Sequence, residues 1–248
     1  DINMGCPSKS VAASGSGAAL IKTPDLAHAI VRAARQGLED WAGGQSIHSQ
    51  GFKPSRIEFI HTLNHSRSGV PVVPRRLLPL SIKTRLGFDC VVVERWVEHL
   101  LAARPAAITL HGRTLQQMYR GAADWSAIAE AAKLAHGTGT LMLGNGDLNT
   151  LVDAIRRAAE SKVQGVLVGR GTLGSPWFFR EKEQARRAFS ERDDLSTLPA
   201  TAWEPQVSVS HRMQVMLDHA RQYEAIAGLE RFRSIRKHLG WYCKGFPH

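Results

Sequence analysis

Short apolar segments alternate with amphipathic helical patterns through the middle of the sequence, and this alternation constrains the fold more than any other feature. The helical patterns have the length, about 10–15 residues, that joins neighbouring parallel strands. Alternation of this kind predicts βαβ units and a parallel sheet. The predicted strands are 80–84, 107–110, 140–143 and 166–168, and the helices that follow them are 92–103, 125–135, 148–160 and 176–189.

A fifth strand is predicted at residues 1–4, directly before Cys6 and Pro7. Pro7 fixes its own φ and biases Cys6 toward an extended conformation, so we expect the thiol at a strand end. A glycine-rich loop follows, and then a helix with Thr23 as its N-cap and Pro24 as its first residue. This helix is expected to run to about residue 40, with apolar residues every four positions at Leu26, Ile30, Ala34 and Leu38.

Polar residues follow each predicted strand directly, which is typical of a site gathered at one edge of a sheet. A TIM barrel collects its chemistry at the carboxyl ends of its strands, with a phosphate site commonly after strands 7 and 8. Glycine-rich turns follow the last two predicted strands, at 144–147 and 169–171. We therefore expect an α/β fold holding about strands 4–8 of a (β/α)8 barrel, with three β/α units upstream in a longer protein. A Rossmann sheet, the competing architecture, carries one glycine-rich loop after its first strand.

The two glycine-rich turns predict a site for a phosphomonoester. Backbone amides of 144–147 can face an anion, and Arg170 after Gly169 adds a charged fork. With Lys83 and His111 on earlier strands, this set suits FMN, because a cation near the flavin ring tunes its electronics. Taken singly, Lys83 also fits a solvated lysine and His111 a satisfied core histidine.

The charge balance favours a polyanionic partner, because 32 Lys and Arg stand against 22 Asp and Glu. Three widely separated cysteines, Cys6, Cys90 and Cys243, predict neither a metal site nor a disulfide framework, and fit a reducing, cytoplasmic location. No run of about 18 apolar residues occurs, so we expect no membrane span. We expect the protein to be a monomer.

Residues 41–78 are predicted to be an insertion with one helix at about 55–64. From about residue 203 the pattern becomes purely helical, with predicted helices at 207–226 and 229–242. The second is expected to place Arg233, Arg236 and Lys237 on one face, opposite an apolar side of Leu229, Phe232, Ile235 and Leu239. We expect 1–195 to be the FMN-binding barrel portion and 203–248 the start of a helical domain. Its basic face either contacts RNA phosphates or is solvated.

Several motifs together resemble the tRNA-dihydrouridine synthases. They are N-x-G-C-P at 3–7, S-I-K-T-R-L-G at 81–87, I-T-L-H-G-R-T at 108–114, G-N-G-D at 144–147, V-G-R-G-T-L-G-S-P-W-F-F at 168–179 and R-K-H-L-G-W-Y-C-K-G at 236–245. The resemblance implies a TIM barrel with a C-terminal helical domain. It also implies reduction of the 5,6 double bond of uridine in tRNA, with FMN and NADPH.

The resemblance assigns roles to residues at the matching positions. Cys6 would be the proton donor to uracil. The implied FMN contacts are Lys83, His111, Asn145, Gly146, Asp147, Gly169 and Arg170, and the residues close to the base or flavin are Asn3, Arg85 and Arg113. Two features depart from the family: the strands that give its first FMN contacts are absent, and the insertion is longer than the usual link.

Two other functions fit the same sequence. A different FMN-dependent barrel that reduces a free pyrimidine would explain the phosphate loops, but not the basic helical tail. The other alternative is a non-catalytic, truncated RNA-binding relic, which a yellow colour of the full-length protein would exclude. The sequence does not indicate which uridine of tRNA is modified.

Overall fold

Five parallel strands form one sheet at the centre of the computed structural model, which describes residues 1–66, 75–190, 198–199 and 201–244. The strands are β1 (Ile2–Met4), β2 (Ser81–Arg85), β3 (Ala107–His111), β4 (Leu141–Asn145) and β5 (Gly165–Leu167), and they lie side by side in chain order. Register brings the strand ends together, with Asn3 opposite Lys83, Arg85 opposite His111, and His111 opposite Asn145.

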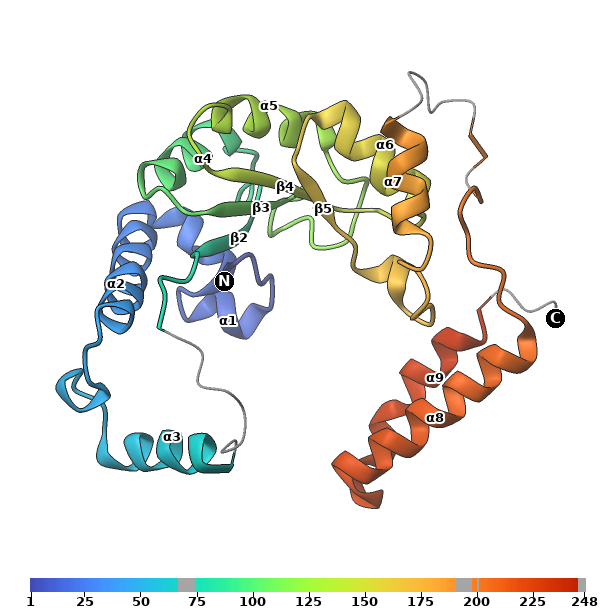
Figure 1. Cartoon of the computed structure of the whole chain (residues 1–248). Helices are drawn as coiled ribbons and strands as arrows, with labels where there is room; N and C mark the ends of the chain where they lie inside the picture. Colours follow the sequence, from blue (N-terminus) through green and yellow to red (C-terminus); the bar gives the residue numbers. More distant parts are fainter. Residues whose placement is uncertain (67–74, 191–197, 200, 245–248) are drawn as a thin grey trace.

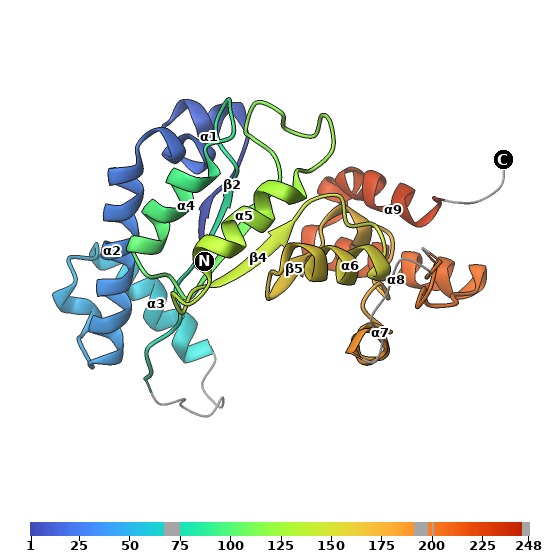
Figure 2. The same ribbon diagram turned by 90° about the horizontal axis from the view of Figure 1, so that it is seen from above.

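Helices cover one face of this sheet (Figures 1 and 2). They are α2 (Pro24–Ala42), α4 (Val93–Ala102), α5 (Trp125–Ala135) and α6 (Leu151–Ser161). The core lies between sheet and helices, where Ile82, Leu100, Ile108, Ile128 and Met142 are fully buried. A doubly wound sheet reverses its strand order at a switch point, and the described strands show no such reversal.

Helix α2 differs from its prediction at its N-terminal end. Leu26 is 51% exposed, and the buried positions are Ala27 and Val31. A spacing of four residues drifts by about 40° per step around a helix of 3.6 residues per turn, so Leu26 turns away from the face that Ile30, Ala34 and Leu38 line. Thr23 holds the N-cap position, but its side chain makes no capping hydrogen bond.

Two later helices begin after their predicted starts. Helix α6 begins at Leu151 rather than 148, because the Thr150 hydroxyl caps it by accepting from the Asp153 amide at 3.0 Å. Helix α7 spans Lys182–Ser190, so Pro176 does not open it. Successive turns precede α7, closed by bonds from the Phe178 amide to the Ser175 carbonyl and from the Arg180 amide to the Trp177 carbonyl.

The remaining elements are short segments around the sheet and a helical pair at the C-terminal side. They are α1 (Lys9–Ala13), η1 (Gly17–Lys22), η2 (Ile47–Ser49), α3 (Pro54–Ser66), η3 (Arg170–Thr172), α8 (Val209–Ala227), η4 (Leu229–Ile235) and α9 (Arg236–Tyr242). The predicted single helix 229–242 is therefore a 3₁₀ segment followed by a short α-helix. Leu229 is 74% exposed and does not join the apolar side assigned to it, since it lies in the tight first turn after Gly228.

Of the helices in the described ranges, none combines the length and apolar character that crossing a bilayer requires.

Candidate functional site

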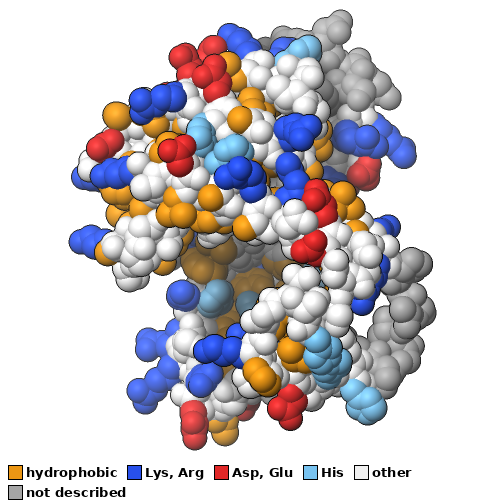
Figure 3. Space-filling view, turned by 90° about the vertical axis from the view of Figure 1, so that its left-hand side faces the viewer, with side chains coloured by type: hydrophobic (Ala, Val, Ile, Leu, Met, Phe, Trp, Pro, Cys, Tyr) orange, Lys and Arg blue, Asp and Glu red, His pale blue; other side chains and the backbone are white. Residues whose placement is uncertain are grey.

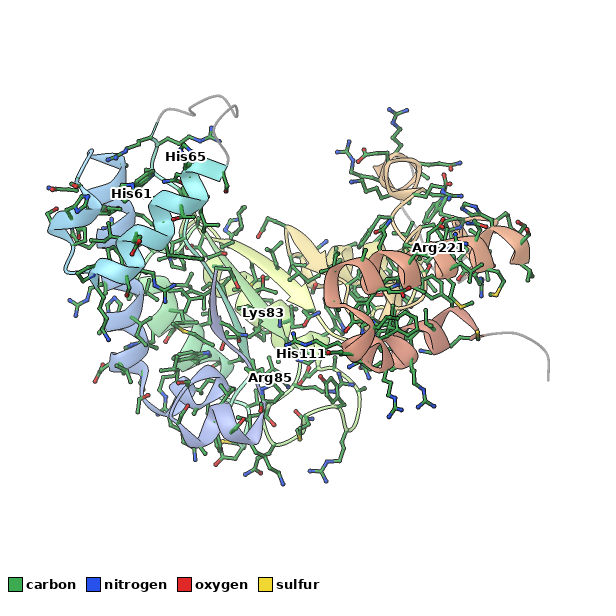
Figure 4. All side chains as sticks on the ribbon, turned by 90° about the horizontal axis from the view of Figure 1, so that it is seen from below. His61, His65, Lys83, Arg85, His111 and Arg221 are labelled. Atoms are coloured by element: carbon green, nitrogen blue, oxygen red, sulfur yellow. The ribbon has the colours of Figure 1, made fainter. Side chains whose placement is uncertain are left out.

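A cavity of about 380 Å³ opens at the carboxyl edge of the sheet, and strands β1 to β4 and the turn after β5 contribute residues to it. Ten of the residues predicted for the site line it: Asn3, Cys6, Lys83, Arg85, His111, Asn145, Gly146, Asp147, Gly169 and Arg170. Figure 4 shows Lys83, Arg85 and His111 close together beside the strands that carry them. Parallel strands in sequential order bring their carboxyl ends to one edge, which is why residues up to about 170 positions apart meet here.

The loop that holds Cys6 is fixed by its own polar groups. The side-chain carbonyl of Asn3 accepts hydrogen bonds from the amides of Gly5 and Cys6, both at 3.0 Å. Gly17, with φ +60°, folds back onto this loop, where a Cβ would lie 2.9 Å from the Cys6 carbonyl oxygen. The thiol is thereby held, partly exposed, at the cavity wall.

Asp147 is the centre of the hydrogen-bond network behind the cavity. Its carboxylate accepts from Arg113 at 2.7 Å, from the Ala123 amide at 2.7 Å and from Arg170 at 2.8 Å. Burial alone would raise its pKa, but the hydrogen bonds and the two guanidinium charges outweigh burial and hold the pKa below 3.8. The carboxylate is therefore ionised at neutral pH and joins the loops after β3, β4 and β5.

Arg113 is used by this network and does not line the cavity. Its side chain is buried, and it donates to the Arg120 and Gly121 carbonyls as well as to Asp147. The role near the base or flavin remains a prediction for Arg113. The position itself indicates that Arg113 holds Asp147 and the loop 112–124 in place.

His111 is a neutral side chain in a cationic setting. Burial, followed by the charges of Arg85, Lys83 and Arg113, lowers its pKa to about 3. The guanidinium of Arg113 lies 3.5 Å from the His111 Nε2, and because a guanidinium only donates, this contact favours Nε2 as the acceptor. In that tautomer the proton is on Nδ1, which can donate one hydrogen bond.

Lys83 and Arg85 give the cavity its positive charge. Within the described residues Lys83 makes no hydrogen bond or ion pair, and burial together with the Arg85 charge lowers its pKa. Arg85 is buried and donates to the carbonyls of Gly5 at 2.8 Å and Thr114 at 3.1 Å. Asp147 is the only carboxylate among the lining residues and already faces two arginines, so the cavity favours an anion.

Two of the glycines that line the cavity, Gly146 and Gly169, differ in what surrounds the position of a Cβ atom. A Cβ on Gly146 would lie 2.5 Å from the Ala123 Cβ, so the protein's own packing excludes it. A Cβ on Gly169 would meet no atom within 4 Å. The space at Gly169 is therefore free for a ligand beside Arg170. Asn145 closes this wall by donating to the Leu167 carbonyl at 2.8 Å, which ties β4 to β5.

Four lining residues were not among the predicted site residues: Gly5 and Pro7, which belong to the N-x-G-C-P motif, and Tyr119 and Asn149, which no motif marks. Tyr119 lies in the long loop between β3 and α5, and its ring centroid is 5.2 Å from the guanidinium carbon of Arg170. No strand-end position marks Tyr119, and only the folded loop brings it to the cavity. Arg233, Arg236 and Lys237 are exposed on η4 and α9 and do not line the cavity.

Comparison with known proteins gives one consistent result. The sequence model of the family described as dihydrouridine synthase matches residues 1–40 and 66–248. A probable tRNA-dihydrouridine synthase of Mycobacterium leprae is 32% identical over all of this chain and 52% of its own length. One of Rhodobacter capsulatus is 33% identical over 98% of this chain and 60% of its own. The tRNA-dihydrouridine synthase B of Pasteurella multocida is 27% identical over 99% of this chain and 59% of its own.

The chain thus spans between half and two thirds of the length of these curated relatives. The family match covers both the strand-end residues and the C-terminal helices, and it leaves out 41–65, the larger part of the predicted insertion. On this match the chain belongs to the dihydrouridine synthase family.

Proposed function

We propose that the full-length protein reduces the 5,6 double bond of a uridine in tRNA, with FMN as its resident cofactor and NADPH as the source of hydride. One observation carries this proposal: a cationic cavity at the strand ends, with a thiol in its wall, in a chain of the dihydrouridine synthase family. The relatives' names supply the substrate class, since they describe synthases that act on tRNA.

The residues present fit an FMN phosphate and ring. The unfilled space at Gly169, next to the exposed Arg170, suits a phosphate, and the cavity volume of about 380 Å³ falls in the range of small-molecule sites. Lys83, which has no partner of its own among the described residues, would place a positive charge beside the ring. His111 would donate a hydrogen bond from Nδ1.

When bound, reduced FMN supplies the hydride that adds to C6 of uracil. Cys6 completes the addition by giving the proton of its thiol to C5, and the thiolate is then reprotonated from solvent, which its partial exposure allows. Asn3 fixes the loop that presents the thiol, and Arg85 holds the same loop through the Gly5 carbonyl. General acid help of this kind accelerates reactions by about 10²–10⁴-fold.

We further propose how the described sheet fits the whole protein. Its five strands correspond to about strands 4–8 of a (β/α)8 barrel within 1–195, and 203–248 begin a helical domain that binds tRNA. Exposed Arg233, Arg236 and Lys237 would contact phosphates, in keeping with the net charge of +10. The uridine would have to leave its stack to reach the cavity.

The direct test starts from tRNA that lacks dihydrouridine and incubates it with the purified full-length protein and NADPH. Nucleoside analysis should then detect dihydrouridine in this tRNA, and NADPH should bleach the flavin absorbance of the protein. Free uridine offered at the same concentration should remain unreduced. Reduction of free uridine with unchanged tRNA would instead identify an FMN-dependent enzyme of pyrimidines.

A further inference from the structure

The segment outside the family match contains an exposed helix with an unusual surface. Helix α3 buries none of its side chains, although packing of an apolar face is what normally stabilises a helix. Phe59 on α3 is 53% exposed, and Phe52 just before it is 48% exposed. Exposed phenylalanine rings on the same part of the surface indicate a binding site for another molecule.

These rings belong to a groove that also carries positive charge. The groove has a volume of about 500 Å³ and is lined by Gly51, Phe52, Lys53, Ser55, Arg56 and Phe59. The Arg56 guanidinium carbon lies 6.0 Å from the Phe59 ring centroid. No carboxylate lines the groove, and Glu58 is the only acidic residue between positions 41 and 66.

The groove lies apart from the strand-end cavity. The chain enters the insertion from the end of α2 and leaves it for the start of β2, so α3 belongs to the amino edge of the sheet. Figure 4 shows His61 and His65 of α3 well separated from Lys83 and His111. Figure 3 shows Lys and Arg side chains beside apolar ones on the lower part of this face, the level at which Figure 1 places both α3 and the C-terminal helices.

We propose that this α3 groove binds unpaired nucleotides of RNA. Exposed aromatic rings stack on bases, and Lys and Arg pair with the phosphates between them, which is how sequence-tolerant single-strand sites are built. An acidic peptide would satisfy Lys53 and Arg56 but leave both rings in water.

The test measures binding of a fluorescent oligoadenylate of about twelve nucleotides to the full-length protein. It contains no uracil and is no substrate for the strand-end cavity. Replacing Phe52 and Phe59 together with Ala should weaken binding by about tenfold or more, with an unchanged salt dependence. Replacing Lys53 and Arg56 with Ala should lower the salt slope by about 0.7 for each phosphate that is no longer neutralised. Leu63→Ala, on the same helix but outside the groove, is the control and should bind as wild type.

Wild-type affinity in the double phenylalanine variant would overturn the proposal. Competition by polyglutamate would also overturn it, if polyglutamate displaces the oligonucleotide and its affinity depends on Lys53 and Arg56 but not on Phe52 and Phe59. That result would identify an acidic-peptide site. All these variants should still form dihydrouridine and retain flavin, because no changed residue lines the strand-end cavity. A failure of the groove proposal is therefore separable from a failure of the proposed reaction.

Discussion

The strand-end cavity and the C-terminal helices both concentrate basic side chains, but they hold them in opposite ways. Arg85 in the cavity wall and Arg113 behind it are buried and fixed by hydrogen bonds to groups far along the chain. On the helices, α8 buries no residue, and Arg233 and Arg236 are exposed. Fixed, buried groups suit a reaction that needs defined geometry, whereas solvated cations suit additive contacts with a polyanion.

This contrast shows that the number of basic residues in a region does not indicate its role. The hydrogen-bond and ion-pair partners of each basic side chain do. Mutations in the cavity should change chemistry or folding by large, specific amounts. Mutations on the helices should change affinity in small steps that salt screens.

Cys6→Ala should give the largest effect. We expect dihydrouridine formation to fall by about 10²–10⁴-fold, because the proton donor is removed. Flavin content and its bleaching by NADPH should persist, since within the described parts of the chain no residue is hydrogen-bonded to the Cys6 side chain. Stopped-flow reduction and nucleoside analysis separate the two steps. Near-normal turnover would remove Cys6 from the mechanism.

Asp147→Asn should destabilise the fold by about 2–3 kcal/mol, because it leaves the buried Arg113 guanidinium facing an amide that only half replaces the carboxylate. Glu160→Gln is the matched control, because both side chains of the Glu160–Arg157 ion pair are exposed. This pair should contribute about 0–0.5 kcal/mol to the free energy of unfolding. Urea unfolding measures both. Equal effects would mean that Asp147 is an ordinary surface charge.

His111 should make stability fall on mild acidification. The unfolded ring takes up a proton at its ordinary pKa of 6.5, while the folded ring stays neutral down to about 3. Stability is therefore full above pH 6.5 and decreases as the pH falls toward 3, by about 2 kcal/mol between about pH 7 and pH 5. His111→Gln should remove this decrease from the plot of the free energy of unfolding against pH. His136 is exposed, and His136→Gln should leave the decrease in place. Parallel profiles for all three proteins would contradict the buried, neutral state.

Gly174 tests how the two regions are joined. Its φ is +74°, and a Cβ there would lie 2.2 Å from the Trp241 carbonyl oxygen at the end of α9. Gly137, with φ +77° and no atom within 4 Å, is the matched control for backbone strain. Each Ala variant should be destabilised by about 1–2 kcal/mol, the cost of the left-handed conformation. A second measurement attaches spin labels to the exposed Cys90 and Cys243, in a protein whose other cysteines have been replaced. Only Gly174→Ala should change the distance between these two labels. An unchanged distance would show that α9 is positioned by other contacts.

Much of this architecture was predictable because hydrophobic periodicity and strand-end chemistry are local signals. The strands and α5 were predicted from them, and ten of the residues predicted for the site do line one cavity. Tyr119 could not be predicted, because a loop brings it to the cavity. The network around Asp147 was also invisible, since it joins three loops across the sheet. The 3₁₀ start of the last helical segment was missed because its apolar spacing also fits an α-helix.

The roles of the cavity and the helices are separated by combining Cys6→Ala with Ala at Arg233, Arg236 and Lys237. Single-turnover rates at saturating tRNA and the affinity for tRNA as a function of salt are measured for wild type, both variants and the combination. The rate should fall only where Cys6 is changed. The salt slope should fall only where the helices are changed, by about 0.7–0.9 for each phosphate that is no longer neutralised. The two effects should add in free energy, because the regions are separate in space. A slower reaction at saturating tRNA in the helix variant, or an unaltered salt slope, would contradict the division of roles between cavity and helices.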